Sequence, residues 1–275
     1  MSRGATETRT RKTAASTGKA LRGWYTANGR HDLPWRATRD RWLVLVSEVM
    51  LHQTQAPRVA LVYDAFVEQF PTPEAMAAAA PADVIAAWDR LGYPRRARWL
   101  WEAARRIDAE GWPDDLSDLA GVGRYTAAAV EAQADDADTI GIEVNIRRVC
   151  ERVNGAHLSP AEAEDAAVAI AAPLRGRDRL LALMDLGAQV CTARNPGCAD
   201  CPIAGDCATR GVLPDETRHR QAAYAGSFRE RRGQVLTRLR QGSVRTAELD
   251  GEALASLLDD GLAEVTRGRA HLPRS

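Results

Sequence analysis

Lysine is almost missing from this chain of 275 residues: Lys12 and Lys19 are the only two, and both lie in the first 20 positions. The remaining cations are arginines, so chemistry that needs a lysine amine, such as Schiff-base formation, is excluded after residue 19. An excess of charge of one sign is also missing, because 37 basic and 37 acidic residues cancel. If such a chain binds nucleic acid, it does so through a local basic face.

Long apolar runs are absent as well. No stretch reaches the length of about 20 residues that spans a bilayer, so we expect a soluble protein with no membrane partner. No secretory signal is recognisable in the sequence, so we do not expect disulfides. A hydrophobic content of 45% nevertheless supplies a sizeable core. Alanine-rich stretches at 74–88 and 161–172 favour helix, and the expected class is mostly α.

Composition divides the chain into a tail, a core, a linker and a small C-terminal domain. Residues 1–18 are polar and basic, and we expect them to be a disordered tail. The folded core is expected over 19–212 and a linker over 213–226. Apolar spacing and Gly/Pro punctuation predict core helices around 42–50, 58–69, 74–79, 82–90, 95–109, 124–134, 145–153, 161–171 and 177–190.

The C-terminal segment, residues 227–275, reads as a domain of its own. Helices are expected at 231–240 and 251–260, followed by a hairpin over 262–273 with Arg267–Arg269 at its turn. This order is typical of a winged helix. Two interpretations remain open, a DNA-contacting module and a packing appendage.

Cysteine is rare, and four of the five cysteines share one short loop with the spacing C-x6-C-x2-C-x5-C: Cys191, Cys198, Cys201 and Cys207. Four thiolates on such a loop can hold one [4Fe-4S] cluster or one zinc ion. Zinc sites usually contain two C-x2-C pairs, and only one is present here. The spacing therefore favours the iron–sulfur cluster, with zinc as the alternative.

A glycine-rich turn marks a second motif. Gly121 and Gly123 flank Val122 between a short expected helix and the alanine-rich helix that starts at Arg124. Glycines permit a tight turn, and the N–H groups at the start of the second helix point outward, where they can bind a DNA phosphate. The pattern predicts a helix–hairpin–helix.

These motifs occur together with further characteristic stretches, namely Leu33–Arg36, Ser47–Gln55, Leu91–Tyr93, Gly121–Thr126, Asn145–Val149 and Met184–Gly187. In this combination the chain resembles the helix-hairpin-helix DNA glycosylase superfamily, and within it the MutY-type adenine glycosylases, over about residues 20–212. The resemblance implies a six-helix lobe at about 39–140 and a second lobe from 19–38 plus 141–212, with the iron–sulfur loop at 191–207. It also implies a prokaryotic, cytoplasmic, nucleoid-associated monomer that binds mismatched or oxidised double-stranded DNA. Its cluster is expected to be structural and DNA-orienting.

The resemblance assigns the catalytic carboxylates. Glu48 lies on an otherwise apolar helix, with Val44 and Leu51 on its own face, so its carboxyl is expected to stay protonated near neutral pH. By resemblance it is the general acid that protonates the departing adenine. A second carboxylate stabilises the oxocarbenium-like transition state. Here that residue is Glu143, two positions before Asn145, where the family has aspartate.

The longer side chain at position 143 leaves three interpretations. A misplacement of about 1 Å can cost on the order of 100-fold in rate. The site is therefore retuned but active, shifted in specificity, or weakened in a homologue that still binds DNA. We favour the first.

The remaining site residues also follow from the resemblance. Tyr125 occupies the position where bifunctional members carry the attacking lysine, so a monofunctional enzyme is expected. Trp35 and Arg36 match pocket-lining positions, and Asp185 matches the acceptor for adenine's amine. Gln53 matches the side chain inserted into the base stack, and Tyr93 matches the wedge beside the opposing 8-oxoguanine. The expected substrate is adenine opposite 8-oxoguanine or guanine, and the alternative is thymine or uracil in a mismatch. Without the family, Trp35 and Tyr93 could be core aromatics and Asp185 a helix cap.

Overall fold

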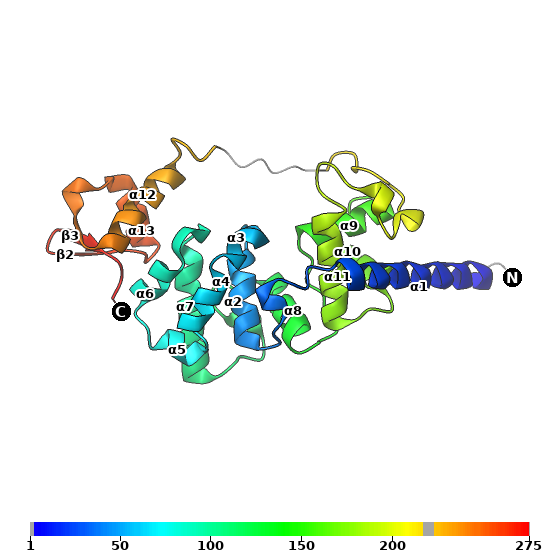
Figure 1. Cartoon of the computed structure of the whole chain (residues 1–275), viewed down its shortest axis with the longest axis horizontal. Helices are drawn as coiled ribbons and strands as arrows, with labels where there is room; N and C mark the ends of the chain where they lie inside the picture. Colours follow the sequence, from blue (N-terminus) through cyan, green and yellow to red (C-terminus); the bar gives the residue numbers. More distant parts are fainter. Residues whose placement is uncertain (1–2, 217–222, 275) are drawn as a thin grey trace. The chain divides into compact units, whose positions relative to one another are not determined.

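The computed structural model describes residues 3–216 and 223–274, and these are mostly helical (Figure 1). By its internal contacts the chain divides into two compact units. The first unit combines Met1–Val44 with Gly123–Arg218, and the second combines Leu45–Val122 with His219–Ser275. The first boundary falls inside helix α2 (Arg41–Leu51), the second before Gly123, the N-cap of α8 (Arg124–Ala134), and the third after residue 218. Helix α8 therefore belongs with the first unit, although the expected six-helix lobe included it.

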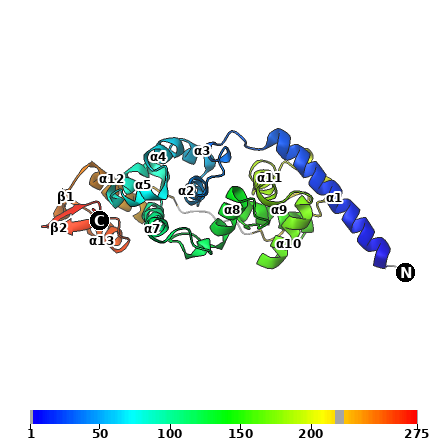
Figure 2. The same ribbon diagram turned by 90° about the horizontal axis from the view of Figure 1, so that it is seen from below.

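The first unit packs its helices around one apolar core. After α1 (Arg3–Asn28) and the short helix η1 (Pro34–Arg36) come α8, α9 (Val144–Asn154), α10 (Pro160–Ala171) and α11 (Gly176–Gln189). Helix α1 lies along α10 and α11 (Figure 2). Gly18 permits this close approach, because a Cβ atom there would lie 1.7 Å from the carbonyl oxygen of Ala172. The core includes Leu21, Ile146, Val149, Leu180, Leu183 and Leu186.

The N-terminus differs from the expected disordered tail. Residues 1 and 2 lie outside the described residues, but α1 begins at Arg3, so residues 3–18 are helical. No proline interrupts the chain before Pro34, and the alanine, arginine and lysine residues of this segment are good helix formers. The helix is also anchored. Leu21 is fully buried, and the Thr17 hydroxyl donates to Asp206 Oδ2 at 2.5 Å.

The second unit starts with the end of α2 and continues through short helices. These are α3 (Ala56–Ala60), α4 (Tyr63–Gln69), α5 (Pro73–Ala77) and α6 (Pro81–Ala87), followed by the longer α7 (Arg95–Glu110). The expected helix at 58–69 is thus two helices, separated at Leu61 and Val62. An edge-to-face aromatic cluster fills the core: Phe66 lies 5.1 Å from Phe70 and 5.8 Å from Trp88 between ring centroids.

The C-terminal domain has the expected order of elements. Residues 223–274 contain two α-helices, α12 (Phe228–Gln241) and α13 (Gly251–Asp259). They also contain three strands, β1 (Val244–Arg245), β2 (Glu264–Thr266) and β3 (Arg269–His271), which form an antiparallel sheet in the order β1-β3-β2. Arg267 and Gly268 both have positive φ, as a two-residue hairpin turn requires. The predicted helices and hairpin are confirmed. Of the predicted linker at 213–226, residues 217–222 lie outside the described residues.

This domain is packed against helices of its own unit. Arg95 on α7 lies 3.3 Å from Asp260, and Arg240 Nη2 on α12 donates to the Ile85 carbonyl at 3.2 Å. The Pro273 carbonyl accepts from Ala82 N, one of the orphan N–H groups at the start of α6. These contacts favour the packing-appendage interpretation. Among the described residues, no helix has both the length and the apolar character to cross a membrane.

Candidate active site and metal centre

Glu48 is buried on α2. Its exposed fraction is 3%, and its helix neighbours Val44 and Ser47 are fully buried. Glu48 is therefore not a surface glutamate, the simplest structural alternative. Burial thus withdraws the Glu48 carboxyl from bulk solvent.

Glu143 is the N-cap residue of α9. Its Oε1 accepts a hydrogen bond from Ile146 N at 2.9 Å, and its Oε2 accepts from Asn145 Nδ2 at 2.9 Å. Burial raises the pKa of Glu143, while these hydrogen bonds and the charge of Arg148 oppose the rise. The glutamate thus reaches the cap position normally taken by a shorter carboxylate, and both of its oxygens are oriented.

Asn145 connects this carboxylate to the cysteine loop. Its Oδ1 accepts from Arg148 Nη2 at 2.7 Å, which fixes the amide so that Nδ2 faces Glu143. Arg148 also donates to the carbonyls of Gly187 at 2.7 Å and Cys191 at 2.6 Å. Glu143 and Asn145, which were expected to act together, are therefore in contact. Arg148, which was not predicted from the sequence, orients Asn145 for this contact.

The hairpin has the geometry that its glycines imply. Gly121 has a φ of +74°, and a Cβ atom there would lie 2.8 Å from the Cβ of Trp99 on α7. Gly123 is the exposed N-cap of α8, and Arg124 follows as an exposed first residue. Tyr125 is half-buried, and its ring lies where a Cβ at Gly141 would clash. The start of α8 is thus open for an anion.

Asp185 has a different environment from the expected one. It is fully buried in the middle of α11, so it is not a helix cap. Its Oδ2 accepts from Arg30 N at 2.9 Å, and its Oδ1 pairs with Arg30 at 2.6 Å and Arg36 at 3.0 Å. These bonds compensate the buried charge and join the N-terminal segment to α11. Trp35, in the same segment, is 2% exposed and packs as a core aromatic.

Gln53 and Tyr93 belong to two turns of the second unit. Gln53 follows the end of α2 with a φ of +54°, and Tyr93 follows Gly92 with a φ of +47°. Gln53 is exposed and Tyr93 is 40% exposed, so Tyr93 is not a core aromatic. Both side chains are available to an external partner, as side chains that insert into DNA must be.

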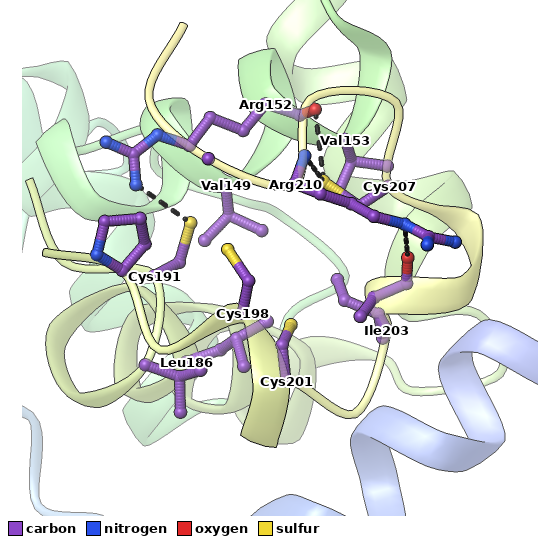
Figure 3. A pocket seen from close by; sticks show the side chains of 14 residues that line it. Val149, Arg152, Val153, Leu186, Cys191, Cys198, Cys201, Ile203, Cys207 and Arg210 are labelled. Carbon is purple, nitrogen blue, oxygen red and sulfur yellow. Dashed lines mark hydrogen bonds between the residues drawn. The ribbon is translucent and has the colours of Figure 1, made fainter.

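The four cysteines line one cavity in the first unit (Figure 3). Cys191, Cys198, Cys201 and Cys207 face it together with Val149, Val153, Leu186 and Ile203. In the described parts of the chain, no three His, Cys, Asp or Glu side chains converge closely enough for a single metal ion. The two findings are compatible, because a [4Fe-4S] cluster takes its thiolates one at each corner, whereas zinc needs them about 2.3 Å from one centre. The donor set and its apolar walls fit the cluster.

Arg152 holds the cysteine loop in place. It is 1% exposed, pairs with Glu216 at 2.9 Å, and donates to Cys191 Sγ at 3.5 Å and to the Thr192 carbonyl at 2.8 Å. Burial raises the pKa of the Cys191 thiol, and the hydrogen bond and charge of Arg152 oppose the rise. Arg30, Arg148 and Arg152 were not predicted from the sequence. Their one signal was the near-exclusive use of arginine, whose planar fork suits several carbonyls at once.

Comparison with known proteins agrees with this site. Residues 46–172 match the family model described as HhH-GPD superfamily base excision DNA repair protein, and residues 191–207 match the iron-sulfur binding domain of endonuclease III. The adenine DNA glycosylase of Mycolicibacterium smegmatis is 41% identical, over 90% of this chain and 92% of its own length. A thymine-DNA glycosylase of Aeropyrum pernix is 33% identical, over 67% of this chain and 89% of its own length.

A solved structure has a similar fold. A thermostable thymine-DNA glycosylase superposes with a TM-score of 0.65 at 28% identity, covering 72% of this chain and 97% of that chain. The fold, the iron–sulfur motif and the extended similarity to the mycobacterial enzyme coincide in one molecule. The chain therefore belongs to the adenine DNA glycosylase family within the HhH-GPD superfamily of base excision DNA repair proteins.

Proposed function

We propose that this protein is a monofunctional DNA glycosylase that hydrolyses the N-glycosidic bond of adenine opposite 8-oxoguanine or guanine in double-stranded DNA. One observation carries the choice of base. Similarity to the mycobacterial adenine DNA glycosylase, 41% over 90% of the chain, exceeds that to the archaeal thymine-DNA glycosylase, 33% over 67%.

The chemistry is assigned to two carboxyl groups, those of buried Glu48 and half-buried Glu143. Protonated Glu48 donates its proton to the adenine ring as the glycosidic bond breaks, so that adenine leaves as a neutral base. The deoxyribose acquires oxocarbenium character, which ionised Glu143 stabilises electrostatically. Deprotonated Glu48 then removes a proton from the attacking water. Asn145 keeps the Glu143 carboxylate oriented through its 2.9 Å hydrogen bond.

The other assigned residues bind DNA. The hairpin of Gly121 and Gly123, with Arg124, takes a backbone phosphate at the start of α8. Gln53 and Tyr93 enter the base stack when adenine is extruded, a step that costs a few kcal/mol and is easiest at a mismatch. Arg36 contributes to the pocket wall, and buried Trp35 and Asp185 support that wall from behind, Asp185 through its partners Arg30 and Arg36. The cluster held by Cys191, Cys198, Cys201 and Cys207 supplies structure and no redox step.

A strand-cleaving lyase step is not part of the proposal. Bifunctional members use a lysine amine that attacks C1′. Tyr125 occupies that position, and the chain contains no lysine after Lys19. The product should therefore be an intact strand with an abasic site.

A panel of base pairs tests the proposal. Single-turnover excision is measured on duplexes with 8-oxoG:A, G:A, G:T and G:U, and each product is run with and without alkali. Adenine should be released from the first two, with strand breaks only after alkali. Cleavage confined to G:T or G:U would identify a pyrimidine mismatch enzyme, which the similarity to thymine-DNA glycosylases makes the second candidate. Binding without excision would indicate a homologue weakened by Glu143.

A further inference from the structure

Arg96 is a buried cation with no place in the chemistry described above. It lies in the first turn of α7, is 4% exposed, and directs its guanidinium toward two turns of the same unit. We call residues 52–54 the Gln53 turn and residues 91–93 the Tyr93 turn. Arg96 contacts both, and its partners among the described residues are neutral oxygens and aromatic rings.

One side of the guanidinium binds the end of α2 and the Gln53 turn. Nη1 donates to the carbonyls of Val49 at 2.8 Å, Met50 at 2.9 Å and His52 at 2.6 Å. Nη2 donates to Thr54 Oγ1 at 3.0 Å. The Val49 and Met50 carbonyls belong to the last turn of α2. Carbonyls in the last turn of a helix have no N–H donor within the helix, so Arg96 supplies their hydrogen bonds. Residues on both sides of Gln53 are therefore fixed.

The other side binds the Tyr93 turn. Nη2 donates to the Gly92 carbonyl at 3.0 Å and Nε to the Tyr93 carbonyl at 3.4 Å, and the Tyr93 ring centroid lies 5.4 Å from the guanidinium carbon. A lysine has three donors on one nitrogen and cannot reproduce this fork. Thr54 Oγ1 also lies 3.3 Å from the Leu91 carbonyl, so the two turns contact each other directly.

Each turn has a strained backbone at its exposed residue, Gln53 or Tyr93. Gln53 and Tyr93 are non-glycine residues with φ values of +54° and +47°. Such conformations cost about 1–3 kcal/mol each and persist only where surrounding contacts over-determine them. Burial lowers the pKa of Arg96 to about 10, so the guanidinium keeps its charge and all its donors at neutral pH. The contacts that hold the two strained residues thus converge on one side chain.

We propose that Arg96 is a positioning residue that locks the Gln53 turn and the Tyr93 turn together, so that both side chains enter the DNA stack as one wedge. This inference rests on the proposed function, in which Gln53 and Tyr93 penetrate the duplex. It adds that neither side chain is placed independently of the other. Loss of the shared arginine should therefore impair extrusion of the base before any bond is broken.

The test measures extrusion separately from excision. A duplex carries 2-aminopurine, a fluorescent adenine analogue, opposite 8-oxoguanine, and its fluorescence rises when the base leaves the stack. Arg96→Lys should abolish most of this rise and lower single-turnover adenine excision by on the order of 100-fold. Arg105→Lys is the matched control, because Arg105 is exposed on the same helix and stacks on Trp101. It should behave as the wild type.

A double-mutant cycle identifies the route of the effect. In a Gln53→Ala/Tyr93→Ala background, Arg96→Lys should cause a further loss of no more than about twofold, since its effect passes through those two side chains. A full additional loss would overturn the proposal and indicate action through α2 and Glu48. A wild-type fluorescence rise in Arg96→Lys would overturn it as well.

A second variant tests the same contacts if Arg96→Lys does not fold. Thr54→Val removes one acceptor of Arg96 while leaving the arginine in place, and it should reduce the fluorescence rise in the same direction. If Arg96→Lys does not fold, as judged by thermal unfolding, an unchanged signal in Thr54→Val would reject the proposal. If the wild type extrudes the base but excises no adenine, the proposed function fails while the wedge proposal stands.

Discussion

At the scale of single residues, the proposed mechanism depends on the carboxylate at position 143. The glutamate caps α9 and is oriented by Ile146 N and by Asn145. An aspartate would be one methylene shorter, yet the cap contacts show that the longer side chain has an ordered place. This geometry supports the interpretation of a retuned, active site over a weakened one.

Glu143→Gln removes the negative charge at this position and so tests whether the carboxylate takes part in an active site. The amide can still accept from Ile146 N, but it cannot stabilise an oxocarbenium ion and it presents a donor to Asn145. Excision in single turnover should fall on the order of 100-fold. Asp165→Asn, an exposed acid on α10, is the control and should leave the rate unchanged. Wild-type activity in Glu143→Gln would remove the residue from the mechanism.

The pH dependence follows from the raised pKa of Glu143. The charged form is the active one, so the excision rate should rise with pH through a value above glutamate's ordinary pKa, and Glu143→Gln should lose this limb. The effect on stability has the opposite sign. A carboxyl whose pKa is raised by folding stabilises the fold below its unfolded pKa, and that contribution is lost as pH rises through the folded pKa. Unfolding and rate profiles recorded over the same pH range check both signs.

At the scale of elements, the cysteine loop depends on a buried ion pair outside the C-x6-C-x2-C-x5-C spacing. Arg152 on α9 pairs with Glu216, their side chains being 2% and 12% exposed. Removal of one partner from such a pair costs about 3–5 kcal/mol. Glu216→Gln should therefore lower thermal stability and speed the loss of the cluster's visible absorbance during exposure to a chelator. Asp215→Asn, at an exposed neighbouring position, should do neither.

The elements that could be predicted from the sequence differ from the contacts that could not. Helices α7 to α11 were predictable because their apolar spacing and their glycine or proline boundaries are local signals. The contacts of Arg148 with the Gly187 and Cys191 carbonyls and the Asp185–Arg30 pair were not, because these residues lie far apart in sequence and only packing brings them together. The helical tail was missed because its anchors, Thr17 with Asp206 and buried Leu21, are tertiary contacts that a polar composition hides.

At the scale of the whole molecule, a chain of zero net charge must bind DNA through a few unpaired cations. In the C-terminal domain the arginines of α12 are largely paired: Arg231 with Asp250 and Glu252, Arg232 with Asp260, and Arg238 with Glu248. Its exposed arginines at the hairpin, Arg267 and Arg269, lie outside these pairs. Helix α13, in the position of a winged-helix recognition helix, carries Glu252 and Asp259 on its exposed face. We therefore do not expect phosphate contacts from α12 or α13, and we expect one from Arg124 at the start of α8.

The salt dependence of DNA affinity distinguishes these sources. Each phosphate contact adds about one to the slope of log affinity against log salt concentration. Arg124→Gln should weaken binding to matched and mismatched duplexes alike and reduce the slope by about one. Arg238→Gln should leave the slope unchanged, since that charge is already neutralised by Glu248. An equal reduction in both variants would show that the C-terminal domain lies on the DNA after all, with its internal ion pairs exchanged for phosphates.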